Sequence, residues 1–536
     1  MTSLAAARAG LLRIKSLEGW RRYLVALGFG CLAALAFAPF RLFPLLLISF
    51  TGLTLLVDAL TDHPNGRRAA FMTGSAFGFG YFGISCMWLA NAFLVQADAF
   101  AWMIPIVLPA FFLFLGLFFG LAGLIHVALL KRYPLHGLRR IVPLLIGLTI
   151  AEWLRGHILT GLPWNLTAQA TAGSTLLMQP LAALGPYGYG FVLTLLSLLP
   201  AAAILAPGTA RKAGLVFGSI SLVIIAYGGA RLSLSPTVLR DDAAVLVIQP
   251  NMGQRDKLDP QKRRQGLRDN LTASADGAST LTGDQSVYVI WPENAYPFLD
   301  RIPDLSSILS DILPTDGYLI TGSIREVPDG YANALLVFGP ASDNAPLKTA
   351  YDKHRLVPFG ETLPFYEVFD ALGIASLSPV GGGGFIAGDG PRTISLGNAP
   401  FAPLICYEDV FPGTLFPKGQ RPDWLVVVTN DAWFGDAAGP EQHLDIARMR
   451  AIENGLPVVR SANTGISAII DPSGRLLQAL PLYQQNRFNF YLPERMETPL
   501  YTQLGIVPLI LFLSICATLV LTKGAQHGID PATRKQ

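Results

Sequence analysis

The segment Ala402-Pro403-Leu404-Ile405-Cys406-Tyr407-Glu408-Asp409 joins an apolar run to a cysteine, a tyrosine and two carboxylates. Residues 402–405 are apolar at every position, which is typical of a short strand buried on both faces of an α/β sheet. The strand is expected to end at Cys406, and open α/β sheets bind their ligands at strand ends. The segment therefore predicts a buried sheet with a thiol at its edge.

Further apolar runs of the same kind lie between about residues 239 and 495. One helix is predicted at Glu441–Glu453, where Leu444, Ala447 and Ala451 share a face. The predicted strands are Ala243–Ile248, Val287–Trp291, Tyr318–Thr321, Ala334–Phe338, Ala402–Ile405, Leu425–Thr429, Val458–Ser461 and Ala468–Ile470. The pattern favours an α/β domain with helices outside the sheet, an architecture that by itself identifies no reaction.

Cys406 is the one cysteine of this domain, because Cys31, Cys86 and Cys516 lie in apolar segments elsewhere in the chain. No disulfide can therefore form within the domain. A lone thiol in an oxidising compartment is a liability unless it is buried or used. A buried structural cysteine and a reactive one both remain open at this point.

Two further predicted strands lead to charged side chains. Val287–Trp291 is followed by Glu293, and Thr349–Tyr351 is followed by Lys353. A carboxylate, an ammonium and a thiol delivered from three strand ends are suited to nucleophilic acyl transfer. An ordinary surface ion pair, worth about 0–1 kcal/mol, would also account for Glu293 and Lys353. Their joint placement with Cys406 favours the catalytic interpretation.

The rest of the chain has the composition of a membrane protein. Of its 536 residues 51% are hydrophobic and 14% are charged, whereas soluble domains carry about 25% charged residues. The net charge of +3 gives no reason to expect nucleic acid as a partner. Apolar runs long enough to cross a bilayer predict about eight spans. They are Tyr23–Phe40, Leu42–Leu60, Ala69–Val95, Ala101–Leu130, Ile141–Leu159, Tyr187–Leu205, Gly214–Leu232 and Leu500–Thr522.

Two of the apolar stretches contain prolines that modify this prediction. Pro105 and Pro109 indicate a tilt or a break near the start of the fourth span. The stretch Ser174–Pro186 is expected to be an interfacial segment leading into the sixth span.

Basic residues cluster between alternate spans, which predicts the orientation of the chain. The clusters are Arg8 to Arg22, Arg67 with Arg68, Lys131 to Arg140, Arg211 with Lys212, and Lys523 to Lys535. By the positive-inside rule both termini lie in the cytoplasm. The predicted domains are a membrane part over residues 1–238, an extracytoplasmic domain over 239–495, and a last span with a tail over 496–536. Ala36-Phe37-Ala38 also resembles a signal-peptide cleavage site, but Pro39 and the later spans favour a retained anchor.

Four strings within the α/β domain resemble the signatures of the nitrilase superfamily. They are WPENAYP (Trp291–Pro297), YDKHRLVPFGE (Tyr351–Glu361), ICYED (Ile405–Asp409) and TNDAWFG (Thr429–Gly435). The resemblance implies an α-β-β-α sandwich with a Glu-Lys-Cys triad, here Glu293, Lys353 and Cys406. It also implies a second essential carboxylate at Glu361.

Other strings narrow the resemblance to a membrane-embedded branch, the apolipoprotein N-acyltransferases. LAFAPFRLFPL (Leu35–Leu45), GLPWN (Gly161–Asn165) and ARMRAIENGLPVVRSANTG (Ala447–Gly465) are similar to that family. The likeness implies a bacterial inner-membrane enzyme with a periplasmic catalytic domain, acting in the last step of lipoprotein maturation. Its reaction would move the sn-1 acyl chain of a phospholipid, such as phosphatidylethanolamine, through a cysteine thioester to the amine of S-diacylglyceryl-cysteine. The chain departs from the family at Leu258, where an aromatic residue is common.

Each candidate residue has a chemical role in this reaction. Glu293 would be the general base for Cys406, and Lys353 would stabilise the thiolate and the oxyanion. Glu361 would orient Lys353 or assist proton transfer. Tyr407 and Glu408 adjoin the nucleophile and are assigned to geometry or to substrate contact.

The expected partners are lipids. They are a phospholipid donor, a diacylglyceryl apolipoprotein acceptor and the membrane lipids themselves. The implied reaction needs no metal or nucleotide, and the sequence contains no P-loop, HExxH or CxxC motif. Without coiled-coil heptads that would argue for assembly, we expect a monomer.

Two other functions compete with this interpretation. A membrane-tethered amidase or nitrilase acting on small amides would use the same triad with water as second nucleophile. It leaves about eight predicted spans without a purpose. A transporter with an extracytoplasmic domain would leave the triad unexplained, and the spans show no internal repeat.

A few further residues carry two interpretations each. Glu152 and Arg155 are expected to pair, to face the bundle or to border a lipid-entry cavity, or else to form a helix-end pair at the interface. His126 is interpreted as an interior or helix-end histidine rather than as a catalytic residue. Gly381–Gly384 is either a mobile lid or a passive loop. The aromatic residues Trp433, Phe434, Tyr296 and Phe298 either line an acyl-chain site or belong to the core.

Overall fold

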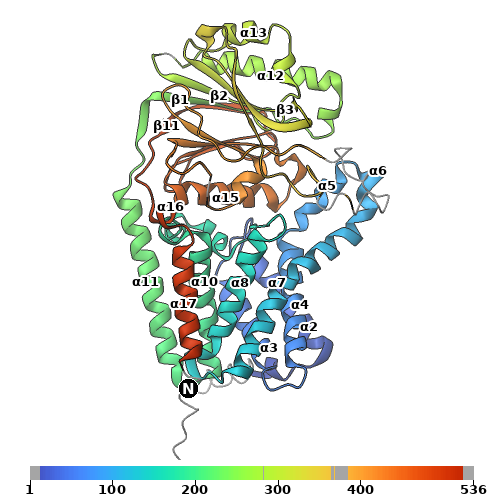
Figure 1. Ribbon diagram of the computed structural model, residues 1–536, viewed down its shortest axis with the longest axis vertical. Coiled ribbons are helices and arrows are strands. Elements are labelled where there is room, and N and C mark those ends of the chain that lie inside the picture. Colours follow the sequence, from blue (N-terminus) through green and yellow to red (C-terminus); the bar gives the residue numbers. More distant parts are fainter. Residues whose placement is uncertain (1–11, 282, 364–366, 368–383, 414, 523–536) are drawn as a thin grey trace, which may run out of the picture. The chain divides into compact units, whose positions relative to one another are not determined.

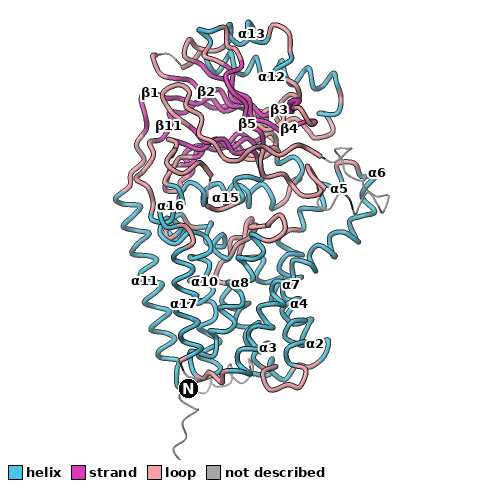
Figure 2. Tube along the Cα trace, viewed as in Figure 1, coloured by secondary structure: helices cyan, strands magenta, loops and turns pink. Residues whose placement is uncertain are grey.

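The computed structural model describes residues 12–281, 283–363, 367, 384–413 and 415–522. The chain divides into two compact units, one formed by Met1–Leu234 with Leu500–Gln536 and the other by Ser235–Pro499. The first unit is helical and the second contains the strands (Figures 1 and 2).

In the part of the helical unit that the structure describes, a short 3-10 turn, Arg13–Ser16, precedes the first of the helices named here. Its helices are α2 (Gly19–Ala34), α3 (Leu45–Asp58), α4 (Gly66–Ser85), α5 (Ala90–Leu94), α6 (Ala97–Phe100), α7 (Ile104–Arg132), α8 (Val142–His157), α9 (Thr175–Met178), α10 (Leu181–Leu205), α11 (Ala210–Leu234), α16 (Leu500–Leu504) and α17 (Val507–Leu521). Helices α10, α11 and α17 run side by side (Figure 1).

Within the described residues, three helical segments are long and apolar enough to cross a membrane, namely Ala97–Arg132, Leu181–Leu205 and Pro207–Leu234. A fourth qualifies if Gly66–Ser85 and Met87–Leu94, which meet at an angle of 59°, count as one span. Each of the eight predicted ranges holds a helix, but α3 and α17 are shorter apolar helices. Eight spans therefore remain a prediction.

The backbone is irregular near the two proline-containing stretches named above. In the fourth range the chain makes a 3-10 turn at Ala101–Met103 before α7 begins, and Pro105 lies in its first turn. Pro109 is accommodated inside α7. Helix α10 bends at Gly185, whose φ of 64° lies outside the helical region. The bend in the third range, at Cys86, was not predicted.

Glu152 and Arg155 of α8 face the interior and bind backbone groups. Arg155 Nη1 donates to the carbonyl oxygens of Leu162 and Trp164, at 2.5 and 2.7 Å. Glu152 Oε1 accepts from the backbone nitrogen and the hydroxyl of Thr167, at 2.6 and 2.9 Å. Irregular backbone at membrane depth needs such partners, because no water is there to supply them. The pair thus holds the loop that follows α8.

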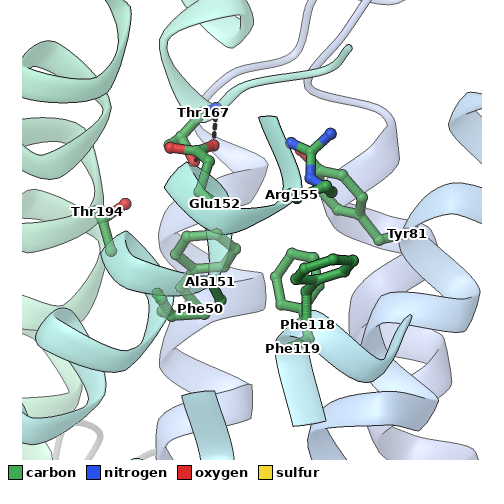
Figure 3. A pocket seen from close by; sticks show the side chains of 10 residues that line it. Phe50, Tyr81, Phe118, Phe119, Ala151, Glu152, Arg155, Thr167 and Thr194 are labelled. Atoms are coloured by element: carbon green, nitrogen blue, oxygen red, sulfur yellow. Dashed lines mark hydrogen bonds between the residues drawn. The ribbon is translucent and has the colours of Figure 1, made fainter. Parts of the chain in front are cut away.

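The same two side chains border a small cavity, together with aromatic residues that include Phe50 and Tyr81 (Figure 3). The cavity measures about 20 Å³, which is room for about one water molecule. Glu152 and Arg155 thus border a cavity, and a role of this region in lipid entry stays a prediction.

His126 belongs to a buried charge cluster at one end of the helical unit. Its Nε2 lies 3.8 Å from Asp58 Oδ1, and Asp58 also pairs with Lys15 at 2.8 Å and with Arg140 at 2.5 Å. The cluster connects α3 and α7 to the segments before α2 and α8. This placement agrees with the interior role predicted for His126.

The α/β unit contains two sheets. The strands are β1 (Leu239–Gln249), β2 (Ser286–Ile290), β3 (Gly317–Val327), β4 (Gly330–Phe338), β5 (Leu347–Asp352), β6 (Phe401–Ile405), β7 (Trp424–Thr429), β8 (Val458–Ala462), β9 (Ala468–Ile470), β10 (Leu476–Ala479) and β11 (Asn486–Pro493). The sheet orders are β11-β1-β2-β3-β4-β5 and β10-β9-β8-β7-β6. Strands β1, β2 and β3 are mutually parallel, as are β6, β7 and β8, and the remaining pairings are antiparallel.

The side chains of these strands alternate between two cores, as the period of two in a strand requires. Val245 and Val247 of β1 face the second sheet, and Leu246 and Ile248 face the outer helices. Helices α12 (Pro260–Ala278) and α13 (Leu305–Ile312) cover the outer face of the first sheet, and α15 (Ala438–Asn454) covers that of the second (Figure 1). The expected α-β-β-α sandwich is confirmed.

Candidate active site

Cys406 lies where β6 ends, at the first position of the 3-10 turn Cys406–Val410. Its φ of 49° lies in the left-handed region, which costs free energy for any residue except glycine. The side chain is partly exposed and packs against the core between the two sheets. Cys406 is therefore only partly exposed, and it lies on a strained turn, as in other nucleophile turns.

Glu408 holds this turn in place. Its carboxylate is fully buried and accepts hydrogen bonds from the backbone nitrogens of Ile405 and His354, both at 2.8 Å, and from the Tyr351 hydroxyl at 2.9 Å. It thereby connects the end of β5 to the end of β6. These contacts support the geometric role considered for Glu408 and leave its carboxylate no room for substrate. Tyr407 is buried and packs edge-on against Phe411, with ring centroids 5.0 Å apart.

Lys353 follows β5 directly and brings the carboxylates together. Its Nζ lies 3.2 Å from Oε1 of Glu293, which follows β2, and 2.9 Å from Oε1 of Glu361. Lys353 is 1% exposed and Glu293 is 6% exposed. Oε2 of Glu361 accepts from the backbone nitrogen of Val357 at 2.8 Å. Glu293 and Lys353, predicted from two strand ends, thus form a buried network with Glu361, the carboxylate implied by the resemblance.

The charges of this network act on the nucleophile. Burial raises the pKa of the Cys406 thiol well above its ordinary value, Glu293 adds to the rise, and Lys353 partly offsets it. Burial also opposes the charge on Lys353, but Glu293 and Glu361 outweigh it, so the pKa of Lys353 lies above its ordinary value. At neutral pH the thiol is therefore protonated beside a charged ammonium, and a base must remove its proton during attack.

Asn333 of β4 belongs to the same network and was missed from the sequence. Its Nδ2 donates to Glu293 Oε1 at 2.8 Å and to Glu361 Oε1 at 2.7 Å. One signal was available, because Asn333 interrupts the otherwise apolar run Ala332–Phe338, which is buried at every position.

A second buried group of charges lies behind the Cys406 turn and was also missed. His443 of α15 contacts Asp409 at 2.7 Å and Asp431 at 2.9 Å, and Arg460 of β8 contacts Asp431 at 2.6 Å. Burial opposes the charge on His443, but the two carboxylates outweigh it and raise the pKa of His443 to about 9. Two cations and two carboxylates thus balance, and they tie the nucleophile's turn to α15 and β8.

Lys257 lies on the other side of Glu293. Its Nζ donates to the carbonyl oxygens of Asn294 at 3.1 Å and Glu293 at 3.4 Å. Burial lowers the pKa of Lys257 to about 8, although Glu293 opposes the change. The neighbouring Leu258, which occupies the place of the family's aromatic residue, is 61% exposed.

The weaker predictions have mixed outcomes. Trp433 is 38% exposed, and the Phe298 ring packs against Tyr331 with centroids 5.7 Å apart. Neither observation decides between an acyl-chain wall and ordinary packing. Of the proposed glycine lid, residues 381–383 lie outside the described residues.

Two family models match the chain. The N-terminal domain of apolipoprotein N-acyltransferase matches residues 29–199, and carbon-nitrogen hydrolase matches residues 253–486.

Relatives match over nearly the full length. The apolipoprotein N-acyltransferase of Rhodopseudomonas palustris is 37% identical over 527 residues, which cover 95% of this chain and 96% of that protein. The protein of the same name from Bradyrhizobium diazoefficiens is 38% identical over 524 residues, with coverage of 94% and 95%. That from Sinorhizobium fredii is 36% identical over 501 residues, with coverage of 91% and 92%. With both domains matched in order and this identity sustained along the chain, it belongs to the apolipoprotein N-acyltransferase family.

Proposed function

We propose that this chain N-acylates apolipoproteins by way of a thioester on Cys406. Membership of the family supports the overall reaction. The observation that carries the mechanism is the strained turn of Cys406, whose thiol is acted on by the charges of Glu293 and Lys353 in the Lys353–Glu293–Glu361 network. The donor is a phospholipid and the acceptor is the amine of a diacylglyceryl-cysteine.

In the first step the enzyme is acylated. Glu293 takes the thiol proton as Cys406 Sγ attacks the ester carbonyl of the phospholipid. The Lys353 ammonium stabilises the oxyanion that forms on the carbonyl oxygen. When the C–O bond breaks, the Glu293 carboxyl returns its proton to the leaving oxygen, which gives a lysophospholipid and the acyl-Cys406 thioester.

In the second step the acceptor amine attacks the thioester. Glu293 takes a proton from the attacking nitrogen, and the intermediate collapses to an amide. The proton then passes from Glu293 to the departing Cys406 thiolate, which restores the starting state. Dividing the exchange in this manner lets two bulky lipids meet the enzyme one after the other.

Glu361 supports both steps by fixing the ammonium. It holds Lys353 Nζ at 2.9 Å and is itself held by the backbone of Val357. We assign it to positioning, because its contacts go to Lys353, Asn333 and the backbone.

The decisive experiment follows the acyl group. Purified enzyme is incubated with phosphatidylethanolamine that carries a labelled sn-1 chain, and mass spectrometry locates the adduct. The label is expected on Cys406, and addition of a diacylglyceryl peptide should move it to the peptide amine. Cys406→Ser should fold and insert normally yet lose essentially all turnover, and activity within tenfold of wild type would show that another group is the nucleophile.

The same assay tests the amidase alternative. Hydrolysis of small soluble amides with no lipid turnover would favour that alternative, and we expect the opposite. We also propose the inner-membrane location and the periplasmic face of the catalytic domain, for which the charge distribution between the predicted spans is the support.

A further inference from the structure

Asn333 stands between the two carboxylates that share Lys353. Its side chain is 5% exposed, and its Nδ2 reaches Oε1 of Glu293 and Oε1 of Glu361 at 2.8 and 2.7 Å. Its backbone oxygen also accepts from the backbone nitrogen of Lys353 at 2.8 Å. One residue thus contacts the catalytic base, the second carboxylate and the chain that carries the ammonium.

The neighbouring carboxylates of Glu293 and Glu361 determine the orientation of the Asn333 carboxamide. Ionised carboxylates only accept hydrogen bonds, so the amide nitrogen must face them and the amide oxygen must face away. Both hydrogens of Nδ2 are used. Each Oε1 atom, of Glu293 and of Glu361, then receives two donors, Asn333 Nδ2 and Lys353 Nζ.

This arrangement of two nitrogen donors and two Oε1 acceptors has two consequences for Glu293, the proposed base. Two negative charges next to a single ammonium repel each other, and the second donor offsets part of that repulsion. The arrangement also saturates Oε1 of Glu293, while its Oε2 accepts no hydrogen bond from the described residues. Oε2 is therefore the oxygen available to the thiol.

We propose that Asn333 is a positioning residue for nucleophile activation. It holds the carboxylates of Glu293 and Glu361 side by side and leaves Oε2 of Glu293 ready to accept the thiol proton of Cys406. This inference rests on the thioester mechanism proposed above. A merely structural Asn333, which only packs β4 against its neighbours, would change stability but not the dependence of acylation on pH.

The test measures the rate of acyl-Cys406 formation from labelled phosphatidylethanolamine between about pH 5.5 and 9. In Asn333→Ala the carboxylates lose two charge-assisted hydrogen bonds, and we expect a rate about 100-fold lower at neutral pH. The acidic limb of the profile should move up by about one pH unit.

Asn333→Asp should show the opposite dependence. The introduced carboxyl can donate one hydrogen bond while it is protonated, whereas its ionised form adds a third negative charge to the network. The rate of Asn333→Asp should therefore fall as the pH rises. Asn270→Ala is the matched control, because Asn270 is 2% exposed on α12 and, among the described residues, no hydrogen bond joins its side chain to Glu293, Lys353 or Cys406. Its profile should match that of wild type.

The possible outcomes distinguish a failure of the role proposed for Asn333 from a failure of the thioester mechanism. If wild-type enzyme forms no acyl adduct on Cys406, the proposed mechanism fails. If wild type forms it and Asn333→Ala does so within threefold and with the same profile, the role of Asn333 is overturned. Should Asn333→Ala not accumulate in membranes, Asn333→Ser is measured in its place. A serine hydroxyl can donate only one of the two hydrogen bonds, so the acidic limb must still move upward, and an unchanged limb would overturn the role of Asn333.

Discussion

The backbone of Cys406 holds a conformation that glycine would adopt more easily. Its φ of 49° costs a non-glycine residue on the order of 1–3 kcal/mol. Because Cys406→Gly relieves this strain, we expect it to melt no lower than Cys406→Ala, although it removes one more carbon. Thermal melting of the two inactive variants in detergent measures the difference. A glycine variant that melts several degrees below the alanine variant would show that the turn is not strained.

Substitutions of Glu293 and Lys353 should both slow acylation, but only that of Lys353 should also lower the melting temperature. We expect Glu293→Gln to lower the rate of acyl-Cys406 formation by about 10²–10⁴-fold, because it removes the base and little else. Lys353→Ala should block the same step and also lower the melting temperature, since it leaves two buried carboxylates without their cation.

The control is Glu326→Gln, which removes a carboxylate that is about half exposed and pairs with Arg301. It should acylate at the wild-type rate. Labelled acyl-enzyme that still accumulates in Glu293→Gln or Lys353→Ala would contradict the role assigned to that residue.

The sequence predicted the contact between Glu293 and Lys353 but not the residues that surround them. Glu293, Lys353 and Cys406 each follow an apolar strand, and strand ends converge in this class of sheet. Asn333 lies within β4, and its approach to both carboxylates depends on the antiparallel register with β3 and β5, which the sequence does not specify. Only the interrupted apolar run around Asn333 hinted at a role.

Among the elements, each predicted strand lies within an observed one or extends past its end by one residue at most, because most of them are apolar runs. Strands β10 and β11 were missed, since β10 is largely exposed and β11 mixes asparagine and arginine with aromatic residues. The bend between α4 and α5 was missed because no proline marks it, and Gly83 in the last turn of α4 is one of several glycines in that helix. Helix α15 was predicted from one apolar face, but its polar residues are buried as well, including His443.

His443 connects α15 to the turn that carries Cys406, and its charge should make stability depend on pH. Its pKa is raised in the folded state from 6.5 to about 9. The stabilisation is therefore fully present below about pH 6.5 and is lost as the pH rises through about 9. The groups that face the ring are Asp409, Asp431 and Arg460, with the Phe434 ring beside them.

His443→Gln tests this dependence. Between about pH 6.5 and 9.5 the melting temperature of wild type should fall further than that of the variant. The comparison uses the difference between the two proteins, because Lys257, with its pKa lowered to about 8, acts in the opposite sense over part of that range. Equal slopes would show that His443 is not charged in the folded protein.

At the scale of the molecule, the positions of basic residues in the helical unit indicate its orientation in the membrane. Lys15 and Arg140 both pair with Asp58 at the end of α3, and Lys131 at the end of α7 donates to the carbonyl oxygen of His63 at 3.0 Å. Basic segments far apart in the sequence thus meet at one end of this unit. Such a concentration of positive charge is typical of a cytoplasmic face.

Cysteine labelling tests this orientation. In a Cys406→Ala background, a membrane-impermeant maleimide should label Asp62→Cys, in the exposed turn after α3, only after the cells are permeabilised. Arg264→Cys, exposed on α12, should be labelled in intact spheroplasts, because the catalytic domain is proposed to face the periplasm. The native cysteines Cys31, Cys86 and Cys516 lie in apolar segments and provide the background. The reverse labelling pattern would invert the topology, and Cys406 would then lie on the cytoplasmic side, away from acceptors whose diacylglyceryl group is presented at the outer leaflet.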